Sequence, residues 1–143
     1  MRVEESVDIA VPPERVWDLV ADPENDPRWC DKVQSVEAIA PGRWRVMHKP
    51  LPFRPPVELL VEHDVLEPPR RLTMREEDDG STFVVEYRLA ATAAGTRFTQ
   101  TSEFEWKRMP RLLQRLLAPG VRRDVRRQLR AVRRLLEAGG APA

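Results

Sequence analysis

The sequence predicts an α+β fold with seven antiparallel strands, two short helices after the first strand, and a long C-terminal helix. Three observations predict it. Hydrophobic residues alternate with polar or small ones near the N-terminus, as in a strand with one buried face. Between residues 33 and 106, strand-like runs are separated by turn residues. After Pro110, hydrophobic residues recur with helical spacing.

The first strand is predicted over residues 3–11. Its buried face would carry Val7, Ile9 and Val11. Pro12 and Pro13 end the strand because proline has no N–H to continue a ladder, and both favour the first turn of a helix.

Two short helices are predicted next. The first is indicated by hydrophobic residues at helical spacing, which are Val16, Trp17, Leu19 and Val20. Pro23 disfavours the helical region for Asp22, so this helix ends there. The segment 25–29 is predicted to be a turn or a second short helix.

Six further strands are predicted between residues 33 and 106. The turn signals that separate them are Pro41-Gly42, residues 49–56, Pro68-Pro69, Asp79-Gly80 and Ala94-Gly95. Short connections of this kind join antiparallel strands.

The last helix carries one hydrophobic stripe. Its members are Leu112, Leu113, Leu116, Leu117, Val121, Val125, Leu129, Val132 and Leu136. Pro119 and Gly120 interrupt the stripe, so we expect a kink there, or a short helix followed by a long one that begins near Pro119. Gly139-Gly140 ends the helix, which gives a single domain over residues 1–138 and a frayed tail at 139–143.

Composition fits one cytoplasmic domain. The chain has 143 residues, of which 41% are hydrophobic. It lacks an apolar run of the ~20 residues that a membrane span needs, and it does not begin like a signal peptide. The single cysteine, Cys30, excludes an internal disulfide and a cysteine-rich metal site, and it fits a small buried side chain.

The predicted last helix is strongly basic. Residues 111–137 hold nine arginines against Asp124 and Glu137. An arginine-rich outer face is most often simply solvated, so neither nucleic acid nor a membrane surface is the expected partner. The alternative that stays open is docking on RNA or an anionic membrane through Arg115, Arg122, Arg126, Arg130 and Arg133.

Residues 6–17 (SVDIAVPPERVW) resemble the first strand, proline-led helix start and helix tryptophan of the START-related (SRPBCC) superfamily, which includes polyketide cyclases/dehydrases and lipid-transport proteins. Asp22-Pro23 with Trp29 is similar to the helical pair that follows. The rest of the chain agrees mainly in the order of elements. The resemblance implies a helix-grip fold, in which a curved sheet surrounds the C-terminal helix and a cavity lies between them.

The resemblance also implies an entrance beside the loop between the third and fourth strands, here residues 49–56 (KPLPFRPP). Its prolines would make a stiff, extended cover. Leu51 and Phe53 could then close over an apolar ligand, or both could be tucked into the core of an ordinary surface loop.

Strand alternation predicts which side chains point into the cavity. The inward residues would be Trp44, Val46 and His48; Val57, Leu59, Val61, His63 and Val65; Leu72, Met74 and Glu76; Phe83, Val85, Tyr87 and Leu89; and Phe98, Gln100, Ser102, Phe104 and Trp106. Six of these are polar, and an unpaired buried polar group costs about 1–3 kcal/mol. Such a face indicates a hydrated or ligand-filled space.

The predicted ligand contacts come from this face, the loop, the last helix and Trp29, which equally fits a core anchor. They are Trp29, Trp44, His48, Leu51, Phe53, Val61, Met74, Glu76, Phe83, Val85, Gln100, Ser102, Leu117, Val121 and Val125.

We predict no metal and no cofactor. His48 and His63 would lie roughly 20 Å apart at ~3.3 Å per residue, too far to share an ion. The six glycines form no dinucleotide or phosphate-binding motif.

His63 and Tyr87 are the candidate catalytic pair. On strands two apart, about 10 Å, a base and a proton donor could act on the two sides of one substrate ring. The predicted function is binding of a small hydrophobic molecule, polyketide-, lipid- or isoprenoid-like, with acid–base cyclisation or dehydration as one possibility and non-catalytic carriage as the other. The sequence leaves a homodimer open.

Overall fold

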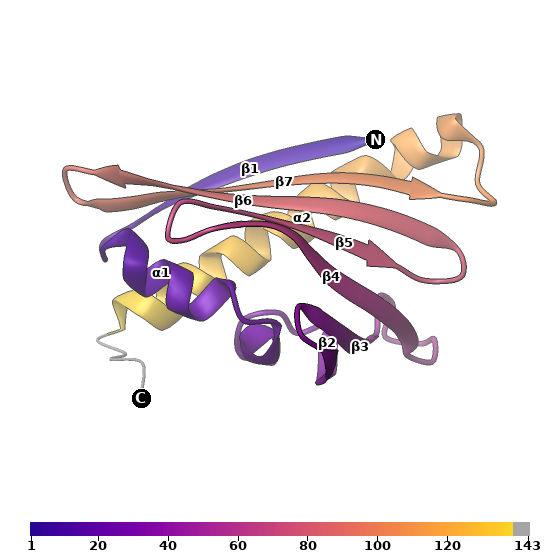
Figure 1. The fold of residues 1–143 in the computed structure, drawn as a ribbon. Coiled ribbons are helices and arrows are strands. Elements are labelled where there is room, and N and C mark those ends of the chain that lie inside the picture. Colours follow the sequence, from indigo (N-terminus) through magenta and orange to yellow (C-terminus); the bar gives the residue numbers. More distant parts are fainter. Residues whose placement is uncertain (139–143) are drawn as a thin grey trace.

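The computed structural model describes residues 1–138 and shows one seven-stranded antiparallel sheet, with α2 along one of its faces (Figure 1). The strand order is β1-β7-β6-β5-β4-β3-β2. The elements are β1 (Arg2–Ile9), α1 (Pro13–Val20), the 3₁₀ helix η1 (Pro23–Arg28), β2 (Val33–Ala40), β3 (Arg43–His48), β4 (Val57–Glu67), β5 (Arg71–Glu77), β6 (Ser81–Thr92), β7 (Gly95–Trp106) and α2 (Arg111–Glu137). This confirms the predicted fold class. The predicted tail, 139–143, lies outside the described residues.

The chain passes from β1 to α1 across the end of β7. The buried Thr96 hydroxyl donates to the Val11 carbonyl at 2.7 Å. Gly95 has a φ of +153°, and a Cβ there would collide with the Ile9 carbonyl oxygen. Only glycine fits this close approach of two backbones. Pro13 then opens α1, as predicted.

The sheet face turned toward α2, here called the inner face, carries most of the core. The C-terminal half of α2 packs mainly on β1 and β7. Its buried residues are Val125, Leu129, Val132 and Leu136. Helix α1 contacts β6 and β7, and η1 contacts β2. The inner face of β3 to β5 therefore lies outside the main contacts of α2.

Helix α2 differs from its prediction in two ways. It continues through Pro119 as one helix, so the alternative of two separate helices is wrong. Pro119 is exposed, where water can replace the missing hydrogen bond. The predicted stripe is also only half buried, because the first four leucines, Leu112, Leu113, Leu116 and Leu117, are 44–72% exposed.

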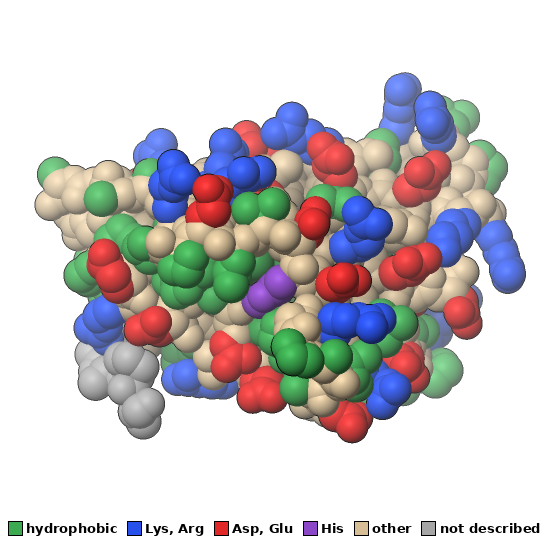
Figure 2. Space-filling model, viewed as in Figure 1, with side chains coloured by type: hydrophobic (Ala, Val, Ile, Leu, Met, Phe, Trp, Pro, Cys, Tyr) green, Lys and Arg blue, Asp and Glu red, His purple; other side chains and the backbone are tan. Residues whose placement is uncertain are grey.

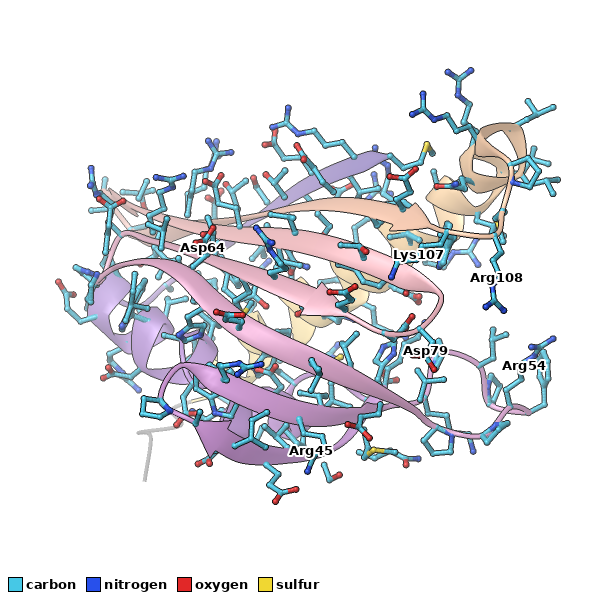
Figure 3. The ribbon with its side chains drawn as sticks, turned by 45° about the vertical axis from the view of Figure 1, so that its right-hand side comes forward. Arg45, Arg54, Asp64, Asp79, Lys107 and Arg108 are labelled. Carbon is cyan, nitrogen blue, oxygen red and sulfur yellow. The ribbon has the colours of Figure 1, made fainter. Side chains whose placement is uncertain are left out.

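Val65 does not point inward as predicted. The β4–β5 register shifts between His63 and Val65, which leaves Asp64 as an extra residue (Figure 3). Val65 then pairs with Thr73 on the outer face, and Leu66 takes the inner position opposite Leu72. A bulge reverses the alternation beyond it.

The opposite, outer face of the sheet is covered by charged side chains of both signs. Arg88 pairs with Glu4 at 2.9 Å and with Glu86 at 3.2 Å, and Glu86 also pairs with Arg71 at 2.8 Å. In Figure 2, acidic and basic side chains are interspersed in the same way. Within residues 1–138, no helix is long and apolar enough to cross a membrane.

Candidate functional site

Cross-strand pairing places the predicted inward residues in rows across the inner face. Trp44, Val61, Glu76, Phe83 and Phe104 are successive partners from β3 to β7. His63, Met74, Val85 and Ser102 form the next row, and Leu72, Tyr87 and Gln100 the one after it. The prediction from strand alternation that these side chains share one face of the sheet is therefore confirmed. Whether they contact a ligand stays a prediction.

Glu76 lies deep among apolar neighbours. Its cross-strand partners are Val61 and Phe83. Burial raises the pKa of the carboxyl to about 7. The side chain nevertheless keeps some accessible surface.

Asp26, on η1, interacts electrostatically with Glu76, and the sequence pattern did not single it out. Asp22 caps this short helix by accepting from the Glu24 N–H at 3.0 Å, and prolines at 23 and 27 fix its backbone. Burial raises the pKa of Asp26 well above its usual value, and the Glu76 and Asp22 carboxylates raise it further. No hydrogen bond joins either the Asp26 or the Glu76 carboxyl to another side chain among residues 1–138.

Tyr87 completes this cluster. Its ring packs edge-on against Phe98, with centroids 5.2 Å apart, and against Trp29 at 6.5 Å. Burial raises the pKa of its hydroxyl well above the usual value, and Asp26 and Glu76 add to the effect. The phenol is therefore neutral, and it can donate a hydrogen bond.

Two further polar atoms near Tyr87 are buried without a partner. They are the Nε1 donor of Trp29 and the Oε1 acceptor of Gln100. The other end of the Gln100 amide donates to the Ser102 hydroxyl at 3.3 Å. Trp29 and Gln100 are each only 6% exposed. Buried polar atoms in folded proteins nearly always have a partner, so a water molecule or a polar atom of a ligand would bind at these two positions.

His63 lies apart from Tyr87. Its ring contacts Trp44, with centroids 4.5 Å apart, and its buried Nε2 has no partner. Burial lowers the pKa of the imidazole, and the nearby Asp22 partly opposes this. The groups that act on Tyr87 are Asp26, Glu76 and Cys30, not His63. The structure thus brings Tyr87 together with the two carboxyls rather than with the predicted base.

His48 lies near a different set of charges. Burial and the neighbouring Lys32 lower its pKa, while Asp78 and Asp124 oppose the shift. Lys32 forms an ion pair with Asp124 of α2, and Arg127 bridges Asp124 and Asp31 at 3.2 and 3.3 Å. These ion pairs join residues 31–32, which precede β2, to α2. Among residues 1–138 no three acidic, histidine or cysteine side chains are grouped to hold a metal.

The predicted contacts from the loop and from α2 are more exposed than those from the sheet. Leu51 is 43% exposed, Phe53 80% and Leu117 44%, and their contact with a ligand stays a prediction. Figure 3 shows Arg54 of this loop and Arg108 of the β7–α2 connection at the same end of the molecule. Val121 and Val125 do pack on the core.

The arginine-rich face of α2 carries a shallow hollow of about 520 Å³. Its lining residues are Arg115, Ala118, Pro119, Arg122, Arg123 and Arg126. Arg122 and Arg126 bind Glu5 of β1 at 2.8 and 3.1 Å. Arg133 pairs with Glu137 at 3.3 Å. These intramolecular ion pairs therefore balance part of the positive charge of α2.

Residues 1–137 match a family model described as polyketide cyclase / dehydrase and lipid transport. The chain belongs to this family. A search of curated proteins gives no match. Among solved structures, the protein TTHA0849 from Thermus thermophilus is 23% identical, with 99% of this chain and 100% of that chain covered and a TM-score of 0.80.

Two other solved structures confirm the START-like, helix-grip fold. A START superfamily protein from Mycobacterium smegmatis is 14% identical over 96% of this chain and 97% of that chain, with a TM-score of 0.80. The di-domain ARO/CYC BexL from the BE-7585A biosynthetic pathway is 17% identical over 99% of this chain and 48% of that chain, again with a TM-score of 0.80.

Proposed function

We propose that this protein binds a small, mainly apolar molecule between the inner face of β3 to β6 and the helices η1 and α2. One observation carries the proposal: an apolar face holds buried polar groups that no protein atom satisfies. These groups are Trp29 Nε1 and Gln100 Oε1. The partly exposed carboxyls of Asp26 and Glu76 lie on the same side and accept no side-chain hydrogen bond within residues 1–138. A few convergent polar groups in an apolar site fix the orientation of a small ligand. The family and the START-like neighbours support the same reading.

The first test is native mass spectrometry of protein purified from its own host, followed by denaturing extraction. We expect a co-purifying apolar molecule of polyketide, lipid or isoprenoid type. Gln100→Leu would replace the unpaired amide with apolar atoms and should reduce occupancy, whereas the exposed Glu62→Gln should not. A protein that is empty and also fails to bind the recovered or added apolar compounds would contradict the proposal.

Acid–base catalysis of cyclisation or dehydration is the more specific form of this function. Its supporting observation is Glu76, whose pKa of about 7 suits proton transfer near neutral pH and which shares the inner face with Tyr87. The imidazole of His63 remains the alternative base. If the recovered molecule is turned over, Glu76→Gln and Tyr87→Phe should each lower kcat by about a hundredfold or more. A larger loss in His63→Phe would favour the histidine.

Non-catalytic carriage is the second candidate function. Leu112 and Leu116, at the start of α2, are 72% and 71% exposed. Arg111 and Arg115 on the same turns have no ion-pair partner among the described residues. Exposed leucines with neighbouring cations suit contact with an anionic membrane, where a carrier would exchange its ligand.

A further inference from the structure

The hollow on α2 is lined by more positive charge than the protein balances. It has a volume of about 520 Å³, and its lining includes four arginines, which are Arg115, Arg122, Arg123 and Arg126. Within residues 1–138, the carboxylate that forms ion pairs with these side chains is that of Glu5. Four positive charges against one negative charge leave three without a counter-charge at the hollow.

The positions of the arginines along α2 concentrate this charge. Arg115, Arg122 and Arg126 recur at intervals of seven and four residues, so they lie on one side of the helix within about 17 Å of its axis. Ala118 and Pro119 lie between them and have short side chains, which leave room among the longer arginine side chains. The result is a depression whose rim carries hydrogen-bond donors.

Glu5 of β1 holds two of these arginines in place. Its Oε1 lies 2.8 Å from Nη1 of Arg122 and 3.1 Å from Nε of Arg126. A guanidinium has five N–H donors, so each of the two side chains keeps donors for a second partner, and both remain partly exposed. Because Glu5 already restricts both side chains, binding an anion here orders fewer torsions than binding one to unrestrained arginines.

Arg115 and Arg123 supply the charge that Glu5 does not balance. Both are exposed, and neither forms an ion pair in the part of the chain that the structure describes. Guanidinium groups bind phosphate oxygens in a bidentate manner. A doubly charged phosphoryl group also offsets more of the excess positive charge than a carboxylate does. The charge and the donors of the hollow therefore suit a phosphoryl group.

We propose that the hollow binds the phosphoryl group of an anionic ligand, with Arg115 and Arg123 free to contact it and with Arg122 and Arg126 held ready by Glu5. Sites for small molecules have volumes in this range. The residues that line the hollow all belong to α2, and none is on the inner face of the sheet. The inference thus goes beyond the proposed function and does not depend on it.

The test measures binding of inorganic pyrophosphate by isothermal titration calorimetry. We expect wild-type protein to bind it, and the affinity to fall about tenfold or more in Arg115→Gln/Arg123→Gln. The matched variant Arg130→Gln/Arg134→Gln removes two exposed arginines of the same helix that do not line the hollow. Its net charge is the same, and its affinity should fall by less than about threefold, because salt screens distant charges.

Equal losses of affinity in the two variants would reveal a general effect of charge and would overturn the inference. Wild-type protein that does not bind pyrophosphate would overturn it too, even if that protein binds RNA. Either result leaves the proposed apolar site standing, since pyrophosphate does not probe it.

Vesicles of phosphatidylcholine with phosphatidic acid identify the source of the phosphoryl group. If pyrophosphate displaces the protein from these vesicles, the ligand is a lipid headgroup. If the protein binds pyrophosphate but not the vesicles, the ligand is a soluble phosphorylated molecule. Both results support the inference.

Discussion

Glu76 is surrounded by Val61, Phe83 and Met74, and this setting determines its acidity. Water would stabilise the carboxylate, but here it is largely replaced by apolar side chains. The neutral acid is therefore favoured in the folded state up to a pKa of about 7, against 4.5 for an ordinary glutamate. As pH rises, the folded protein therefore keeps the proton on Glu76 to a higher pH than the unfolded chain does.

This proton makes stability pH-dependent. Because the pKa is raised on folding, the contribution of Glu76 is fully present below about pH 4.5 and is lost as pH rises through about 7. We expect Glu76→Gln to become more stable relative to wild type by about 3 kcal/mol between these limits. Urea unfolding of both proteins at several pH values measures the difference. A difference that does not change with pH would show that Glu76 is well solvated.

Strand alternation was sufficient to place Glu76, Tyr87 and Gln100 on the inner face, because side chains in a strand alternate strictly. It could not find Asp26. The segment Pro-Glu-Asn-Asp-Pro-Arg is polar and too short to show a helical period, so it indicates only a turn. The direction of Asp26 depends on how η1 lies against the sheet, which is a tertiary property.

At the scale of helices and strands, residue spacing predicted which elements form but missed features that depend on how the elements pair and pack. Hydrophobic spacing and proline positions predicted each helix and strand. The bulge at Asp64 has no signal in the spacing, and it changed the side on which Val65 lies. The spacing also predicted an apolar stripe along α2 without showing that β1 and β7 cover only its C-terminal half.

The β1–β7 junction provides a test at this scale. Gly95→Ala should destabilise the protein by roughly 2–4 kcal/mol, because its Cβ would collide with the Ile9 carbonyl in the neighbouring backbone. Gly120→Ala is the matched control, since a Cβ there meets nothing within 4 Å. It should stabilise α2 by about 0.5–1 kcal/mol. Thermal unfolding of the two variants should therefore shift in opposite directions, and a harmless Gly95→Ala would contradict this account of the junction.

At the scale of the whole molecule, charge is unevenly divided between α2 and the sheet. Part of the α2 charge is balanced by Glu5, Asp31 and Asp124. Arg111 and Arg115, which have no ion-pair partner within residues 1–138, lie at the start of α2 beside the exposed leucines, which is the arrangement that the carrier function would need.

Vesicle binding tests this arrangement. We expect the protein to co-sediment with vesicles of anionic lipid but not with neutral ones, and binding should weaken as salt rises. Leu112→Ser/Leu116→Ser should reduce binding without lowering the unfolding temperature, because both side chains are exposed. Equal binding to both vesicle types, or none to either, would remove the membrane contact from consideration. Salt-sensitive binding to RNA alone would point to the nucleic-acid alternative instead.

The continuous course of α2 through Pro119 has a dynamic consequence. The residues after Pro119 belong to the core, whereas those before it are fixed mainly through the buried Gln114, whose amide donates to the Trp106 and Met109 carbonyls at 3.3 and 2.8 Å. One helix thus spans two regions of different local stability. Native-state hydrogen exchange should show amides of residues 112–118 exchanging by local opening, while those around Leu129 and Val132 exchange only when the whole protein unfolds.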